Sequence, residues 1–190
     1  MVAPPSVAAN LDDWRRASDR TETLFAAGGF SVEARVQVYE DDRLRATVRD
    51  QTGVDRSWRF FLVARLELTP SPPVTGALRG LVASRASRGF TDRLEDRGFD
   101  AVERVERRTL RVGDDEARLF GYDARCLVEG LSLSVDGWLA VWVPDDAFRL
   151  AGGAYPTSID GEGPTADALA DALDPAAFRS ALFELVRATG

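Results

Sequence analysis

The sequence predicts an α+β fold, in which a single antiparallel sheet of about seven strands has helices packed mainly on one face. Three features of the chain support this expectation. Apolar and polar residues alternate over several stretches of strand length, as expected of strands with one buried face. Short acidic or glycine-containing turns separate these stretches. Segments with helical spacing of apolar residues stand before, between and after them.

The first part of the chain predicts one helix and then three strands. In residues 10–27, apolar side chains recur at spacings of three and four, which is typical of an amphipathic helix, with Asn10 as its cap and Gly28 after its end. Residues 30–69 predict the first part of the sheet. Its expected strands are residues 30–38, 43–49 and 58–68.

A second helix, further strands and a closing helix complete the prediction. Pro70 ends the third strand because proline cannot donate to a sheet ladder. Thr75 is a suitable cap for a helix over residues 75–97, interrupted at Gly89, and alternation indicates a second part of the sheet over residues 101–155. The remaining elements are a loop over 156–165, a short helical segment over 166–173 and a C-terminal helix over 174–188, with Asp174 as its cap.

This order of elements resembles the PsbP-like fold, whose superfamily includes the extrinsic photosystem II subunit and the Ran-release factors. The resemblance covers residues 10–188, and it is strongest at residues 148–156, where a late strand runs into a loop before the final helix. The chain is also similar to uncharacterised haloarchaeal proteins. The resemblance implies a role in protein interaction or assembly rather than catalysis. At 190 residues, the chain fits one domain over residues 1–190.

All basic side chains are arginine: the chain has 24 arginines and 31 acids, no lysine and no histidine, and a net charge of −7. Because lysine is normally among the commonest residues, we interpret this composition as coding bias combined with the acidic surface of a cytoplasmic protein from a salt-accumulating halophile. An acidic chain is not expected to bind nucleic acid. The longest apolar run, residues 138–143, is far shorter than the roughly 18–20 residues of a membrane span, and the N-terminus lacks the features of a signal peptide.

The missing side chains exclude several kinds of chemistry. Without histidine there is no Ser-His-Asp triad, and without lysine there is no Schiff base and no Walker-A phosphate loop. The single cysteine, Cys126, cannot form a disulfide within the chain, and its place on an alternating apolar face predicts a buried thiol. Acid pairs in the turns lack the spacing of a calcium loop and predict solvated surface. We therefore expect no catalytic residue, no metal and no cofactor.

One candidate binding site is a group of arginines in the first hairpin. Arg43, Arg45 and Arg49, together with Arg35, are expected on its polar face. Clustered guanidinium groups can hold a phosphate or a carboxylate through paired hydrogen bonds. The alternative, which we favour, is a solvated face whose arginines pair with neighbouring acids.

The other candidate is the end of the last predicted strand. Gly152 and Gly153 can let a ligand approach the backbone, and Tyr155 can supply a polar contact beside the loop that runs to Pro164. The alternative is a bulge or close packing between strands. Between the two candidates we prefer this one, because high salt screens charged faces and strengthens apolar contacts.

These features predict a non-enzymatic cytoplasmic protein of a halophilic archaeon that binds an unknown protein partner or assembles with itself, with no nucleic-acid or membrane partner. A small-ligand-binding domain that uses a concave sheet face near residues 148–164 is the alternative. A hydrolase or isomerase that uses only carboxylates is the least favoured. A deep pocket with convergent polar groups favours ligand binding, whereas a flat apolar patch favours protein interaction.

The acidic composition leads to a prediction about salt. Repulsion within a chain of net charge −7 is relieved when ions screen it, so the melting temperature should rise from low to molar KCl. Thermal unfolding followed by circular dichroism measures this change. A melting temperature that stays flat or falls with KCl contradicts the inferred adaptation to salt.

Overall fold

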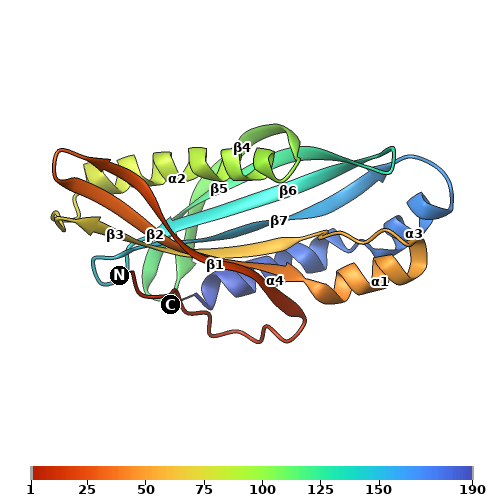
Figure 1. The fold of residues 1–190 in the computed structure, drawn as a ribbon, viewed down its shortest axis with the longest axis horizontal. Helices are drawn as coiled ribbons and strands as arrows, with labels where there is room; N and C mark the ends of the chain where they lie inside the picture. Colours follow the sequence, from red (N-terminus) through yellow and green to blue (C-terminus); the bar gives the residue numbers. More distant parts are fainter. Residues whose placement is uncertain (1, 190) are drawn as a thin grey trace.

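The structure, a computed structural model, describes residues 2–189. Its elements are β1 (Trp14–Ala27), β2 (Phe30–Asp41), α1 (Asp42–Thr52), β3 (Phe60–Thr69), α2 (Gly76–Asp96), β4 (Asp100–Val112), β5 (Asp115–Val128), β6 (Leu131–Trp142), β7 (Phe148–Asp160), α3 (Pro164–Ala172) and α4 (Pro175–Arg187). The backbone N–H of Ala8 donates to the carbonyl of Ala188 at 2.7 Å. The two ends of the chain therefore lie close together (Figure 1).

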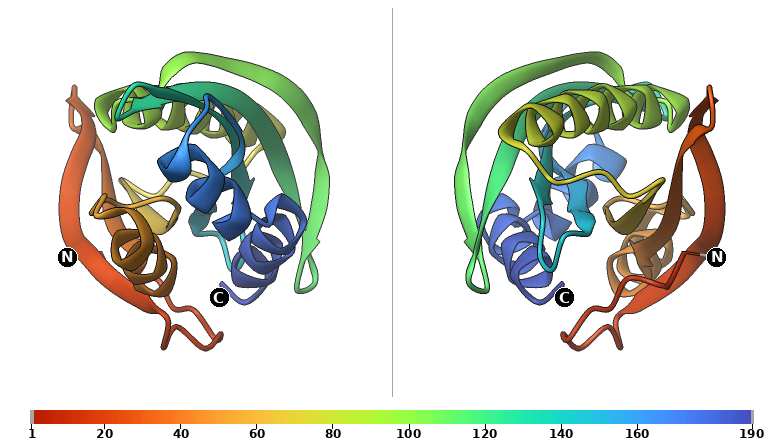
Figure 2. Two further views of the ribbon diagram at one scale, coloured as in Figure 1. Left: turned by 90° about the vertical axis from the view of Figure 1, so that its right-hand side faces the viewer. Right: turned by 90° about the vertical axis from the view of Figure 1, so that its left-hand side faces the viewer.

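The strands form one antiparallel sheet of seven strands in the order β1-β2-β3-β7-β6-β5-β4. Strands β4 to β7 are joined in sequence, and the pairing of β3 with β7 unites the two halves of the chain. The sheet is strongly curved, so that β1 and β4 lie on opposite sides of the molecule in the end-on views (Figure 2). The predicted fold class, α+β with an antiparallel sheet of this size, is confirmed.

Helices cover both faces of the central strands. Helix α2 packs on one face, where the rings of Phe90 and Tyr122 have centroids 5.1 Å apart. Helix α4 packs on the other face, where Phe183 lies 5.3 Å from Trp138. Helices α1 and α3 contact each other on the same side as α4 (Figure 2). Three of the four helices thus share a face, and the longest helix, α2, covers the opposite one.

A band of glycines crosses the middle of the sheet. The strand register places Gly121 of β5 and Gly153 of β7 on either side of Trp138 of β6. A Cβ atom at Gly121 would meet the Trp138 ring at 2.9 Å, and one at Gly153 would meet the carbonyl oxygen of Phe60 at 2.1 Å. The missing side chains therefore give the indole its space beneath α4 and let β7 approach β3 closely.

The same band serves helix α2 on the opposite face. Gly137 lies directly opposite Tyr122, and a Cβ atom there would already touch Phe90 and Tyr122 at 3.4 Å. The hydroxyl groups of Tyr122 and Ser87 are 2.7 Å apart, so the buried phenol has a hydrogen-bond partner on α2. Helices α2 and α4 therefore pack on opposite faces of the sheet at the same level, where the glycine band crosses it.

The predicted helix over residues 10–27 is wrong, because this segment contains strand β1. β1 is an edge strand whose pairing with β2 shifts register twice. Each shift changes which side chains point toward the core. As a result, the partly buried residues recur at every fourth position, at Trp14, Ser18 and Glu22, and they imitate the periodicity of a helix.

The predicted strand over residues 43–49 is also wrong, because these residues belong to helix α1. The side chain of Asp41 caps the helix by accepting from the N–H of Leu44 at 2.8 Å. Gly53 ends it in a left-handed conformation, with φ of 77°. Leu44 and Val48, four positions apart, form its buried face. Alternating apolar residues fitted a strand equally well, and the capping residues carried the deciding information.

The remaining elements agree with the predicted ones apart from two boundaries. Helix α2 continues through Gly89, and β7 extends to Asp160 through part of the predicted loop over 156–165. Cys126 is buried, as expected, and burial raises the pKa of its thiol. Within the described residues, no helix combines the length and the apolar character that crossing a membrane requires.

The glycine band leads to a prediction with a matched control. In Gly152→Ala, the new Cβ would meet the carbonyl oxygen of Trp138 at 2.2 Å, and a backbone atom in mid-sheet cannot move aside cheaply. We expect a loss of about 3 kcal/mol or more in the free energy of unfolding. Gly89→Ala, in open space on α2, should instead gain about 0.5–1 kcal/mol. Denaturant unfolding at constant KCl measures both, and equal effects would contradict the close packing at Gly152.

Candidate functional site

A groove of about 690 Å³ lies where three separate segments of the chain meet. One wall is the connection from α1 to β3, the second is the end of α2 with the start of β4, and the third is the turn between β5 and β6. Its lining residues are Thr52, Gly53, Val54, Asp55, Arg56, Ser57, Trp58, Arg59, Phe60, Arg97, Phe99, Leu127, Val128 and Glu129. This volume is in the range of ligand-binding pockets.

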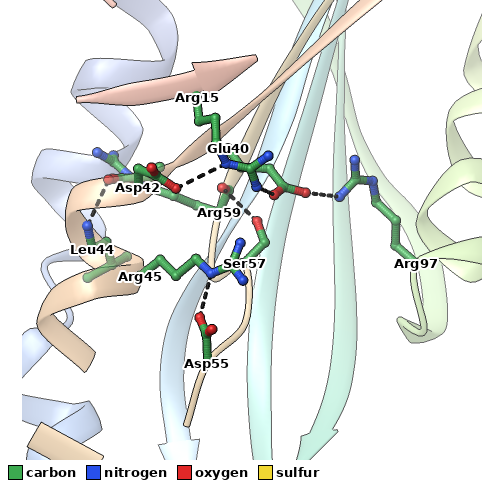
Figure 3. A network of polar contacts seen from close by, with 10 residues as sticks. Arg15, Glu40, Asp42, Leu44, Arg45, Asp55, Ser57, Arg59 and Arg97 are labelled. Atoms are coloured by element: carbon green, nitrogen blue, oxygen red, sulfur yellow. Dashed lines mark hydrogen bonds and ion pairs between the residues drawn. The ribbon is translucent and has the colours of Figure 1, made fainter. Parts of the chain in front are cut away.

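Ion pairs hold the first wall of the groove against the rest of the fold (Figure 3). The guanidinium of Arg45, on α1, binds Asp55 at 2.6 Å. Arg59 binds the carboxylate of Asp41, the residue that caps α1. The Arg59 guanidinium also lies 4.8 Å from the ring centroid of Trp14 and 4.5 Å from that of Phe178. This connection is therefore fixed at both its helical end and its strand end.

Arg97 projects from the end of α2 at the second wall of the groove. Its guanidinium lies 4.2 Å from the ring centroid of Phe60 and 3.5 Å from a carboxylate oxygen of Glu40. Glu40 also accepts a hydrogen bond from Arg15 at 2.9 Å, so one carboxylate serves two guanidinium groups (Figure 3). Burial lowers the pKa of Arg97, and Glu40 opposes this change. Arg97 therefore carries positive charge that Glu40 only partly compensates.

Arg56 provides a second positive charge in the groove. Its guanidinium lies 5.6 Å from the ring centroid of Trp58. In the part of the chain that the structure describes, no carboxylate lies within ion-pair distance of Arg56. The indole N–H of Trp58 is buried and has no hydrogen-bond partner within residues 2–189. Phe99 and Leu127 add apolar side chains to the lining of the groove. The side chain of Leu127 is 68% exposed and is therefore accessible to a ligand.

The groove has few groups that could carry out a reaction. The hydroxyl of Ser57 donates to the carbonyl of Arg59 at 3.4 Å. The hydrogen bond from Arg45 lowers the pKa of Asp55, so this group remains a carboxylate at neutral pH. Among the described residues, no three acidic or thiol side chains gather in a way that could hold a metal ion. The arrangement suits non-covalent binding of an anion with an apolar part.

Asp136, on β6, is a carboxylate with a raised pKa, but it lies outside the groove. Burial raises the pKa of Asp136, and the charge of Asp123, directly opposite on β5, raises it further. Tyr155 lies directly opposite on β7. None of these three side chains lines the groove. The raised pKa therefore does not place an acid or a base beside the space available to a ligand.

The predicted arginine group is not assembled on one hairpin. Arg43, Arg45 and Arg49 lie on helix α1, and each is paired with an acid: with Asp13 at 3.4 Å, Asp55 at 2.6 Å and Asp50 at 3.6 Å, respectively. Arg35 lies apart from them, on β2, and binds Asp19. Placing these arginines on the polar face of a hairpin was therefore wrong, and their pairing with acids agrees with the alternative interpretation. Arg45 alone approaches the groove, where it holds Asp55.

The structure places the second group of predicted residues in the core. Gly152 and Gly153 lie in the glycine band, and Tyr155 is only 2% exposed. The indole N–H of Trp138 donates to the hydroxyl of Tyr155 at 3.2 Å. Burial is the main cause that raises the pKa of Tyr155, to about 12. These residues do not line the groove, and their contacts correspond to the close packing that was the alternative.

The residues that do form the groove were not identified from the sequence. Arg56, Arg97, Phe99 and Leu127 come from three segments that no motif connects. Arg56 follows helix α1, whose type was predicted wrongly, whereas Arg97 follows α2, whose end was predicted to within one residue. Only the sheet order, which brings these ends together, could have identified the site.

The chain belongs to the family described as Domain of unknown function (DUF6517), whose match covers residues 1–190. No curated protein and no solved structure gives a significant match to it. The family assigns no activity, so the function has to be inferred from the groove and from the surface of the fold.

Proposed function

We propose that the protein is a non-catalytic binding protein that holds a small organic anion in the groove. The observation that carries this proposal is the pairing of two guanidinium groups, Arg56 and Arg97, with an aromatic and apolar lining. The ligand class is a carboxylate, phosphate or sulfonate attached to an apolar or aromatic body. Charged hydrogen bonds orient the anion, while Phe99 and Leu127 contact the body.

The conditions in the proposed host favour such a mixed ligand. We infer that the protein works in the cytoplasm of a salt-accumulating archaeon and that its fold belongs to the PsbP-like superfamily. In molar salt the Debye length is about 3 Å, so an exposed ion pair contributes little, whereas apolar contacts are kept or strengthened. In the open groove, a ligand with an apolar body therefore binds more tightly than a bare ion of the same charge. The same setting makes nucleic acid and membranes unsuitable partners for a chain of net charge −7.

Binding of an aromatic sulfonate, 8-anilinonaphthalene-1-sulfonate, tests this proposal. The dye's fluorescence should rise on binding to the folded protein in molar KCl, with a single class of sites. Arg56→Gln should weaken the dissociation constant by about tenfold, which corresponds to about 1.4 kcal/mol for a lost charged hydrogen bond. Arg85→Gln, which removes an exposed arginine of α2 outside the groove, is the matched control and should leave it unchanged.

The result is read together with the stability of each variant. Arg56 has no carboxylate partner among the described side chains, so its replacement breaks no ion pair. It removes only the contacts with the Trp58 ring and the Cys126 thiol, so the melting temperature should fall by a few degrees at most. Equal dye affinity in the wild type, Arg56→Gln and Arg85→Gln would overturn the proposed site. A lower affinity that accompanies general unfolding is recognised by the circular dichroism spectrum, and Arg97→Met then provides the second variant.

A second function, self-association, is favoured by the tip of the hairpin between β1 and β2. Leu24 and Phe25 are 54% and 52% exposed, and the ring of Phe25 lies 6.1 Å from that of Phe30. No charged residue interrupts the segment from Leu24 to Phe30, which projects from the sheet (Figure 1). Apolar side chains gathered on a projecting turn are typical of a contact surface. We propose that a second copy of the chain covers this tip in an assembly.

Sedimentation velocity measures this association. The wild type should sediment increasingly as a dimer or larger species as its concentration rises in molar KCl, because the salt screens the repulsion between acidic copies. The double variant Leu24→Ser, Phe25→Ser should remain monomeric, whereas Leu81→Ser, at an exposed apolar residue on α2, is the control and should behave as the wild type. A monomer at all concentrations contradicts the assembly role and leaves the groove proposal unaffected.

A further inference from the structure

Three arginines lie side by side on β2, β3 and β7, which are neighbouring strands of the sheet. The strand register pairs Arg35 of β2 with Arg65 of β3, and Arg65 with Arg149 of β7. Residues paired in this way on neighbouring strands have Cβ atoms about 4.5–5.5 Å apart and point to the same face. This is the face on which α4 packs. Gly153 is four residues after Arg149 on β7 and therefore faces the same side of the sheet, where it lies against Leu182 of α4.

Only the first arginine of this row is neutralised. Arg35 binds both carboxylate oxygens of Asp19, at 2.9 and 3.1 Å. Over residues 2–189, neither Arg65 nor Arg149 has a carboxylate within ion-pair distance. Two positions further along β2 and β3, Glu33 lies opposite Glu67. Neither carboxylate comes within ion-pair distance of Arg65 or Arg149.

Arg149 also has an unsatisfied donor. Its Nε atom is buried and has no hydrogen-bond partner among the described residues. Burial lowers the pKa of Arg149, the positive charge of Arg65 lowers it further, and Asp145 partly opposes both. Its neighbour on β6 is Trp142, which offers no acceptor and is only 2% exposed. A buried donor without a partner destabilises the folded state, and like charges on paired residues add repulsion.

We propose that Arg65 and Arg149 form a binding site for a single oxyanion: a phosphate, a sulfate or a carboxylate group. One such anion bridging the two guanidinium groups accepts hydrogen bonds from the terminal NH groups of both arginines. It also converts the repulsion between the two cations into attraction. Neither arginine lines the groove, so this site is independent of the proposed organic-anion site.

Inorganic phosphate is the first probe for this site. Line broadening in the ³¹P spectrum of phosphate reports binding, and thermal unfolding in phosphate, compared with KCl of equal ionic strength, reports stabilisation of the folded state. The wild type should show both effects. Arg149→Gln and Arg65→Gln should each weaken the phosphate affinity by about tenfold or more, whereas Arg85→Gln, outside the row, should retain the wild-type affinity.

The phosphate-free stability of the variants separates binding from a structural role. Removing one cation of an unneutralised pair relieves repulsion, so Arg65→Gln should unfold at the same temperature as the wild type or a higher one in phosphate-free KCl. Parallel titrations with sulfate and acetate identify the class of anion, since a site for a carboxylate responds to acetate and one for a tetrahedral oxyanion does not. The absence of ³¹P broadening in the wild type together with no sulfate or acetate effect overturns the proposal. So does an equal response of all variants.

Discussion

Strand β7 passes between β3 and β6 with no side chain at Gly152 or Gly153, and the rest of the fold depends on this close approach. A Cβ atom at either position would collide with a backbone oxygen of a neighbouring strand. Because the strands approach so closely, Trp138 can occupy the space between Gly121 and Gly153 and receive α4. On the opposite face, Gly137 leaves room for Tyr122 and for the packing of α2. The two helical layers are therefore positioned by one cross-section of the sheet rather than by separate cores.

The position of the groove follows from how the surrounding segments are fixed to that centre. Asp41 caps α1 and also binds Arg59, whose guanidinium is held between Trp14 of β1 and Phe178 of α4. One carboxylate thus connects the edge of the sheet, two helices and the start of β3. Glu40, the preceding residue, bridges Arg15 and Arg97 on the opposite side of β2. Glu40 and Asp41, two successive residues of β2, therefore hold the connection between α1 and β3, which forms one wall of the groove, from both sides.

The elements that could be predicted from the sequence are those in which each side of the strand or helix faces the same surroundings, core or solvent, along its whole length. The pairings of β2 with β3 and of β5 with β6 each keep one register along their length, so the alternation in these strands could be recognised. Helices α2 and α4 could be recognised from their capping residues, Thr75 and Asp174. β1 was misassigned because its register shifts mix the two strand faces, and α1 because Leu44 and Val48 satisfy a strand and a helix equally. The groove could not be predicted for a different reason: its residues are local neighbours only after β3 has paired with β7.

The restriction to arginine determines how positive charge is used throughout the structure. A guanidinium is planar and weakly hydrated, so it can lie against an aromatic ring while it binds a carboxylate, as Arg59 and Arg97 do. Lysine, a compact and strongly hydrated cation, could not fill both roles. Arg59 and Arg97 are therefore part of the packing of the fold, and Arg97 shares its carboxylate partner, Glu40, with Arg15. The cations available for a ligand are those that the fold leaves without a carboxylate, which is why Arg56 marks one site and the pair Arg65 and Arg149 marks another.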